Sequence, residues 1–207
     1  MRRNHFNLPA VLESSLKHLR QKGRCFYDVR AKWILAGVFF DSSRFRSSEI
    51  IVEVFIQPLF VPFEDLAFNL GERCETSTSV WDVNNPNAMN ELASLLSSSV
   101  ARIHGTAESL EKLAESALIK DRLADTFVKE TLIGICCILG RFNIALEIID
   151  HGKSQLQKSG WQGEQLKRFA EVETAIQNGN PEQALEFLTL RSETTRRNLR
   201  NKLELDL

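Results

Sequence analysis

Two apolar runs decide the fold class of this chain: Trp33-Ile34-Leu35-Ala36-Gly37-Val38-Phe39-Phe40 and Ile50-Ile51-Val52-Glu53-Val54-Phe55-Ile56. Both are rich in β-branched and aromatic residues, which favour strands. In the second run Ile50, Val52 and Val54 fall on one face, as expected for a half-buried strand. The first run is apolar on both faces, so it is predicted to be a central strand that is covered on each side.

The segments around these runs complete a predicted sheet within residues 24–71. Cys25, Tyr27 and Val29 alternate with polar residues, and the even positions of 66–70 are apolar. Short polar connectors, such as residues 41–43, favour an antiparallel meander of about four strands. A helix is predicted before the sheet, from Asn7-Leu8-Pro9 to a left-handed cap at Gly23.

After residue 84 the pattern is helical. Asn85 is predicted to cap a helix, Thr106 to cap the next one, and His151-Gly152 to end another. The segment 127–139 is apolar nearly all round, which predicts a buried helix. The sequence therefore predicts an α+β protein with a helix and antiparallel sheet in residues 1–84. Helical hairpins are expected in residues 85–207, packed on the sheet as one unit.

An internal echo appears in the helical half. Gly140-Arg-Phe-Asn-Ile-Ala-Leu-Glu-Ile matches Gly179-Asn-Pro-Glu-Gln-Ala-Leu-Glu-Phe, 39 residues further on. In each, a glycine closes one helix, and a small alanine (Ala145 or Ala184) lets the next helix approach closely. The pattern resembles the second half of tetratricopeptide-type helical hairpins.

Composition is typical of a soluble globular chain, with 43% hydrophobic and 26% charged residues among 207. The apolar run Leu132–Leu139 is far shorter than the roughly 20 residues that span a bilayer. No signal-peptide apolar region follows the basic start, so a cytoplasmic protein without membrane association is expected. The four cysteines are expected to be reduced and mostly buried.

Motifs for catalysis or cofactor binding are absent from the sequence. There is no glycine-rich phosphate loop and no G-x-S-x-G, and the four histidines are widely separated. No catalytic, cofactor-binding or metal-binding residue is therefore predicted, and no cofactor is expected. Because catalytic residues can meet in space from distant positions, an enzyme of unknown reaction stays open as an alternative.

Charge is segregated along the chain although the net charge is only −1. Residues 1–46 carry a balance of +7, residues 47–130 one of −8, and residues 131–207 one of zero. The acidic segment includes Glu72, Glu75, Trp81 and Asp82. These four are predicted to form a partner-binding surface, an aromatic anchor with acidic flanks. The alternative is that Trp81 plugs the edge of the sheet.

The basic first third suggests a second alternative. Lysines and arginines are interleaved there with Phe26, Tyr27 and Trp33, and a basic groove with stacking aromatics is what nucleic-acid binding requires. The sequence pI near 6.4 argues against this function.

The order of elements also resembles a known group of proteins. Gly23, the Phe26-Tyr27 pair and Asn69-Leu70-Gly71, together with the two apolar runs, resemble small bacterial α+β domains of unknown function from toxin–immunity conflict systems. That resemblance implies binding and neutralising another protein. The expected function is a non-catalytic interaction module, an immunity or regulatory protein with a basic partner, and a homodimer is also open.

Overall fold

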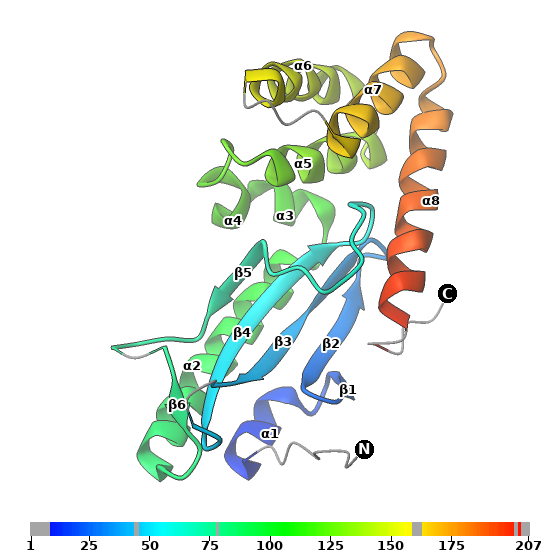
Figure 1. The fold of residues 1–207 in the computed structure, drawn as a ribbon. Helices are drawn as coiled ribbons and strands as arrows, with labels where there is room; N and C mark the ends of the chain where they lie inside the picture. The colour runs from blue at the N-terminus through cyan, green and yellow to red at the C-terminus, as the bar shows by residue number, and fades with distance from the viewer. Residues whose placement is uncertain (1–8, 44–45, 78, 159–162, 201–202, 204–207) are drawn as a thin grey trace. The chain divides into compact units, whose positions relative to one another are not determined.

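The computed structural model describes residues 9–43, 46–77, 79–158, 163–200 and 203 of the chain. The predicted α+β class is confirmed: an N-terminal helix and a mostly antiparallel sheet precede a helical region (Figure 1). Within the described residues, no helix is both long and apolar enough to cross a membrane.

Contacts divide the chain into two compact units. The sheet unit comprises residues 1–57, 66–109 and 201–204, and the helical unit comprises residues 58–65, 110–200 and 205–207. This division differs from the expected one between residues 84 and 85, because helix α2 (Pro86–Thr106) belongs with the sheet.

The sheet follows the meander that the sequence predicts, with short strands added. Its strands are β1 (Arg20–Lys22), β2 (Cys25–Arg30), β3 (Ile34–Ser42), β4 (Glu49–Pro58), β5 (Leu70–Arg73) and β6 (Trp81–Asp82). The order is β1-β2-β3-β4-β5, and β6 pairs with β4 through Ile50 and Trp81. As predicted, Ile50, Val52 and Val54 are buried.

Two expectations about the sheet are wrong in position. The strand expected over residues 66–70 begins only at Leu70, because the N–H of Ala67 donates to the side chain of the buried Gln57 at 3.1 Å rather than to a neighbouring strand. Gly23 does have a positive φ of 59°, but it turns β1 into β2. The first described helix, α1 (Ala10–Leu16), ends well before it, and Asn7 lies outside the described residues.

Helix α2 packs on α1 and on strands β3 and β6, and Figure 1 shows it crossing one face of the sheet. The predicted cap is confirmed: the side chain of Asn85 accepts hydrogen bonds from the N–H groups of Asn87 and Ala88. Thr106, however, is the last residue of α2 and does not cap the next helix.

The helical unit begins with two short helices, α3 (Leu110–Glu115) and α4 (Ala117–Lys120). Two hairpins follow: α5 (Thr126–Ile138) packs on α6 (Phe142–Lys158), and α7 (Glu164–Gln177) packs on α8 (Pro181–Arg200). Helix α5 is buried on most of its surface, as predicted. Helix α6 runs through His151 and Gly152, so the helix end expected there is wrong.

The internal echo corresponds to two matching turns. Gly140 and Gly179 both have φ of 71°. After Gly140, the N–H of Arg141 donates to Cys136 O at 2.7 Å, and after Gly179 the N–H of Asn180 donates to Ala175 O at 2.9 Å. These bonds define a Schellman motif, which needs a left-handed residue and therefore favours glycine. The alanines of the echo are fully buried in both hairpins.

Candidate protein-binding surface

Helix α8 is fixed along one side by packing within the helical unit. Its buried residues recur at helical spacing: Ala184, Leu188, Ser192, Thr195 and Leu199. The hydroxyl of Thr195 donates to Val61 O at 3.3 Å, and Asn198 Nδ2 donates to Phe63 O at 3.0 Å. Nη2 of Arg191 donates to Glu171 Oε2 at 2.9 Å. These contacts fix the rotation of α8 about its own axis, so its opposite face is held in one orientation.

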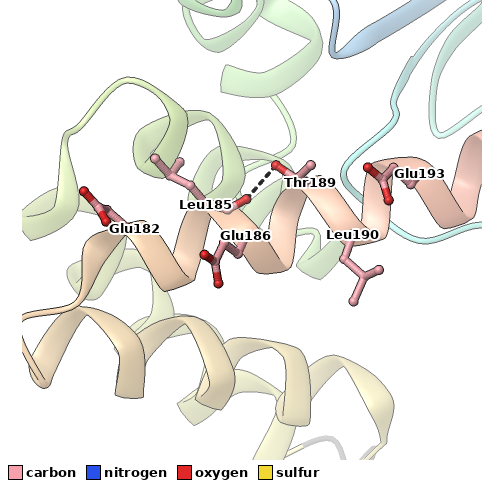
Figure 2. A pocket seen from close by; sticks show the side chains of 6 residues that line it. All are labelled: Glu182, Leu185, Glu186, Thr189, Leu190 and Glu193. Carbon is pink, nitrogen blue, oxygen red and sulfur yellow. Dashed lines mark hydrogen bonds between the residues drawn. The ribbon is translucent and has the colours of Figure 1, made fainter. Parts of the chain in front are cut away.

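That opposite face carries a shallow, open depression of about 370 Å³ (Figure 2). Its lining comes from α8 alone: Glu182, Leu185, Glu186, Thr189, Leu190 and Glu193. The side chain of Leu190 is 61% exposed, the largest exposure among the large hydrophobic residues that the structure describes. Figure 2 shows Glu186 and Leu190 pointing to the same side of the helix.

The depression is negatively charged. Glu182, Glu186 and Glu193 are all exposed. Among the residues that the structure describes, none of these carboxylates has an ion pair or a hydrogen bond. The face thus combines an exposed leucine with three carboxylates that are available to a cation.

Trp81, the aromatic anchor predicted from the sequence, lies inside the sheet unit. It is 2% exposed, and its Nε1 donates to Cys74 O at 2.6 Å. The indole therefore fills the edge of the sheet, which is the alternative that the sequence left open.

The predicted acidic flanks of Trp81 are only partly available. Glu72 forms an ion pair with Arg102 of α2. Asp82 accepts a hydrogen bond from the N–H of Asn84 at 3.0 Å, and Glu75 is exposed. Of the four predicted residues, only Glu75 presents an exposed carboxylate.

A second polar cluster joins α5 to α7. Glu130 is 5% exposed and accepts from Arg168 Nε at 2.5 Å and Nη2 at 3.0 Å. Gln165 Nε2 also donates to Glu130 at 3.1 Å. Burial acts to lower the pKa of Arg168, but Glu130, together with the charges of Glu164 and Glu171, outweighs burial, and the pKa is raised. Because each charge has its partner, this cluster holds the hairpins together.

Beside that pair, Lys129 is 4% exposed and donates to Gln155 Oε1. Burial lowers its pKa, against an opposing effect of Asp125. Since Nζ also lies 3.5 Å from Ala124 O, this lysine is hydrogen-bonded within the unit.

The structure also brings together two histidines that lie far apart in the sequence. The rings of His18 and His104 meet edge to face, with centroids 5.2 Å apart. Arg30 Nη2 lies 3.2 Å from His104 Nδ1. Because arginine can only donate, Nδ1 must accept, and Nε2 carries the proton. Burial, then the charges of Arg30 and His18, lower the pKa of His104 to about 4 against an opposing effect of Asp28.

The four cysteines are all buried. Across the described part of the chain, no group of three or more His, Cys, Asp or Glu could hold a metal. Burial raises the pKa of Cys25 and Cys137 to about 12, so both stay as thiols. In the basic first third, Arg24 forms an ion pair with Asp41 and Arg30 with Asp28, both within the sheet unit.

No family model, no curated protein and no solved structure matches this chain. The charge balance of the sequence does not indicate the α8 face, because residues 131–207 have a net charge of zero. The spacing of charged residues by three and four along the last helix is the signal that could have indicated it.

Proposed function

We propose that this chain is a non-catalytic, cytoplasmic protein-interaction module whose α8 face binds a basic segment of another protein. The observation that carries the proposal is Leu190, 61% exposed on a helix whose opposite side is fixed, with exposed carboxylates around it.

The physics of this face suits such a partner. An apolar side chain that becomes buried on binding supplies affinity, and carboxylates around it select for lysine or arginine and speed encounter. Because α8 is already ordered, binding would not require the helix to form first. The partner segment would carry at least one apolar side chain and basic side chains on the same face.

The biological form that we propose is an immunity or regulatory protein that binds and neutralises a basic protein. The support for this form is the sequence resemblance to toxin–immunity domains, together with the repeated sequence at Gly140 and Gly179, which resembles the second half of tetratricopeptide-type hairpins. In that arrangement the sheet unit would stabilise the chain, and the last hairpin would provide the contact.

A direct test uses a fluorescently labelled amphipathic peptide of lysines and leucines as the probe. Anisotropy should report binding with a Kd of about 10–100 μM at low salt, and binding should weaken as salt is added. The triple variant Glu182→Gln, Glu186→Gln, Glu193→Gln should bind about tenfold more weakly.

The matched control removes the same number of exposed carboxylates elsewhere in the helical unit, as Glu111→Gln, Glu147→Gln, Glu164→Gln. It should bind as the wild type does. Equal affinity for the wild type and the α8 triple variant would show that this face is not the binding surface.

A further inference from the structure

The exposed side of α8 extends beyond the depression, and its charge changes sign along the helix. Its residues recur at alternating spacings of four and three: Glu186, Leu190, Glu193, Arg197 and Arg200. All five are exposed, and Glu182 lies one turn before the first of them. Residues at this spacing share one side of a helix. The stripe is thus acidic in its first half and basic in its second, with Leu190 near the middle.

Two copies of this stripe have complementary charges when they lie antiparallel. In an antiparallel pair with a two-fold axis between residues 191 and 192, Glu186 of one copy is level with Arg197 of the other, since each is five and a half residues from the axis. Arg200 is likewise level with Gln183 and next to Glu182. The two-fold symmetry repeats every pair, so four Glu–Arg contacts would form.

We propose that, when no basic target protein is bound, the α8 face is occupied by a second copy of this chain, packed antiparallel along α8. This inference rests on the proposed function, because it names a further occupant of the same surface. Leu190 supplies the apolar centre: the two copies of Leu190 are offset by three residues, or about 4.5 Å along the helices, and contact each other across the axis.

The residues of the stripe are also unused within the chain. Among the residues that the structure describes, the side chains of Glu186, Arg197 and Arg200 form no hydrogen bond or ion pair. The stripe from Glu182 to Arg200 is about 27 Å long. A contact between two single helices of that length is smaller than a standard interface, so the dimer should be weak, with a Kd of about 10–100 μM.

One residue opposes the association. The two copies of Glu193 lie near the axis, offset by the same three residues as the two leucines, so their like charges repel. The repulsion between the two copies of Glu193 distinguishes a second copy from any other basic partner. Glu193→Gln should strengthen self-association several-fold, whereas the same change should weaken binding of the lysine–leucine peptide.

Charge reversal tests the pairing itself by sedimentation equilibrium, from about 1 μM to about 300 μM protein. Glu186→Arg and Arg197→Glu should each weaken the dimer by about tenfold or more, because each places like charges opposite each other twice. An equimolar mixture of the two variants should dimerise again, since Glu–Arg pairs form at both ends of the heterodimer. The double variant E186R/R197E should also dimerise.

The matched control is Glu147→Arg, which makes the same charge change at an exposed position of α6 and should leave the dimer unchanged. A wild-type chain that stays monomeric throughout the concentration range would overturn the inference. So would a mixture of the two variants that fails to recover. If the wild type is monomeric but the peptide binds, the second copy is wrong as the partner, and the proposed function stands. If the dimer forms and the peptide does not bind, the α8 face is specific for its own copy.

Discussion

Gly152 of α6 lies against the ring of Phe169 of α7. A Cβ atom at position 152 would lie 2.6 Å from Cε2 of that ring, closer than side chains approach. Phe169 is 1% exposed, so its ring has little room to move. The glycine therefore leaves room for the ring of Phe169, and this explains why a residue with poor helix propensity lies inside α6.

Gly152→Ala should lower the free energy of unfolding of the helical unit by about 1–3 kcal/mol, because the added methyl group forces Phe169 to shift. Gly105→Ala is the matched control: it also lies in a helix, but nothing is within 4 Å of the added Cβ. That change should stabilise by up to about 1 kcal/mol through helix propensity. Urea denaturation of both variants checks the two opposite signs.

The buried Glu130–Arg168 pair predicts a large effect from a small change. Glu130→Gln removes the negative charge and leaves Arg168, 21% exposed, without its counter-ion. We expect a loss of about 3 kcal/mol in the free energy of unfolding. Glu53→Gln breaks a pair with Arg73, which is 52% exposed, and should lose less than about 1 kcal/mol. Similar losses in the two variants would argue against a buried, structural role for Glu130.

The lowered pKa of His104 predicts that the folded protein loses stability in mild acid. Its folded pKa is about 4, against 6.5 for an unperturbed histidine, and burial is the main cause. Because the folded value is the lower one, the stability that this group contributes is complete above about pH 6.5 and is lost as the pH falls toward 4. His104→Gln, which can still accept from Arg30, should flatten the pH dependence of unfolding in that window. His18→Gln should reduce the loss of stability without abolishing it, because the charge of His18 helps to lower the pKa of His104. Identical slopes for the wild type and His104→Gln would contradict the assignment.

The cysteines should be unreactive in the folded chain. Burial raises the pKa of Cys74 to about 11, with Ser99 acting in the opposite direction, and raises the pKa of Cys136 as well. At about pH 8, Ellman's reagent should label the native protein slowly, because the thiolate is the reacting form. All four thiols should react after unfolding in guanidinium. A fast-reacting thiol in the native state would point to an accessible cysteine.

Local patterns predicted the parts of the fold that local physics decides. The period-two pattern of β4 and the cap at Asn85 need only the residue and its neighbours, and both are as expected. Ala145 and Ala184 were predicted from a repeated turn, and both are buried.

Predictions from local patterns were wrong where a residue distant in the sequence determines the structure. The side chain of Gln57 takes the N–H of Ala67 and delays β5. The ring of Phe169 occupies the space that a side chain at position 152 would need, so a glycine lies there. The local sequence pattern His151-Gly152 instead predicted a helix end. The proposed binding surface was missed for a different reason. The net charge counted over residues 131–207 averages the two ends of one helix face, so the charges of Glu186 and Arg197 cancel.

Carboxyl footprinting tests the central claim, that the α8 face is the binding surface, most directly. A carbodiimide and an amine label exposed carboxylates, and mass spectrometry measures the labelling of each glutamate with and without the lysine–leucine peptide. We predict that the peptide lowers labelling of Glu186 and Glu193, while Glu75 of the sheet unit is labelled as before. Protection of Glu75 with unchanged labelling of Glu186 and Glu193 would contradict the account.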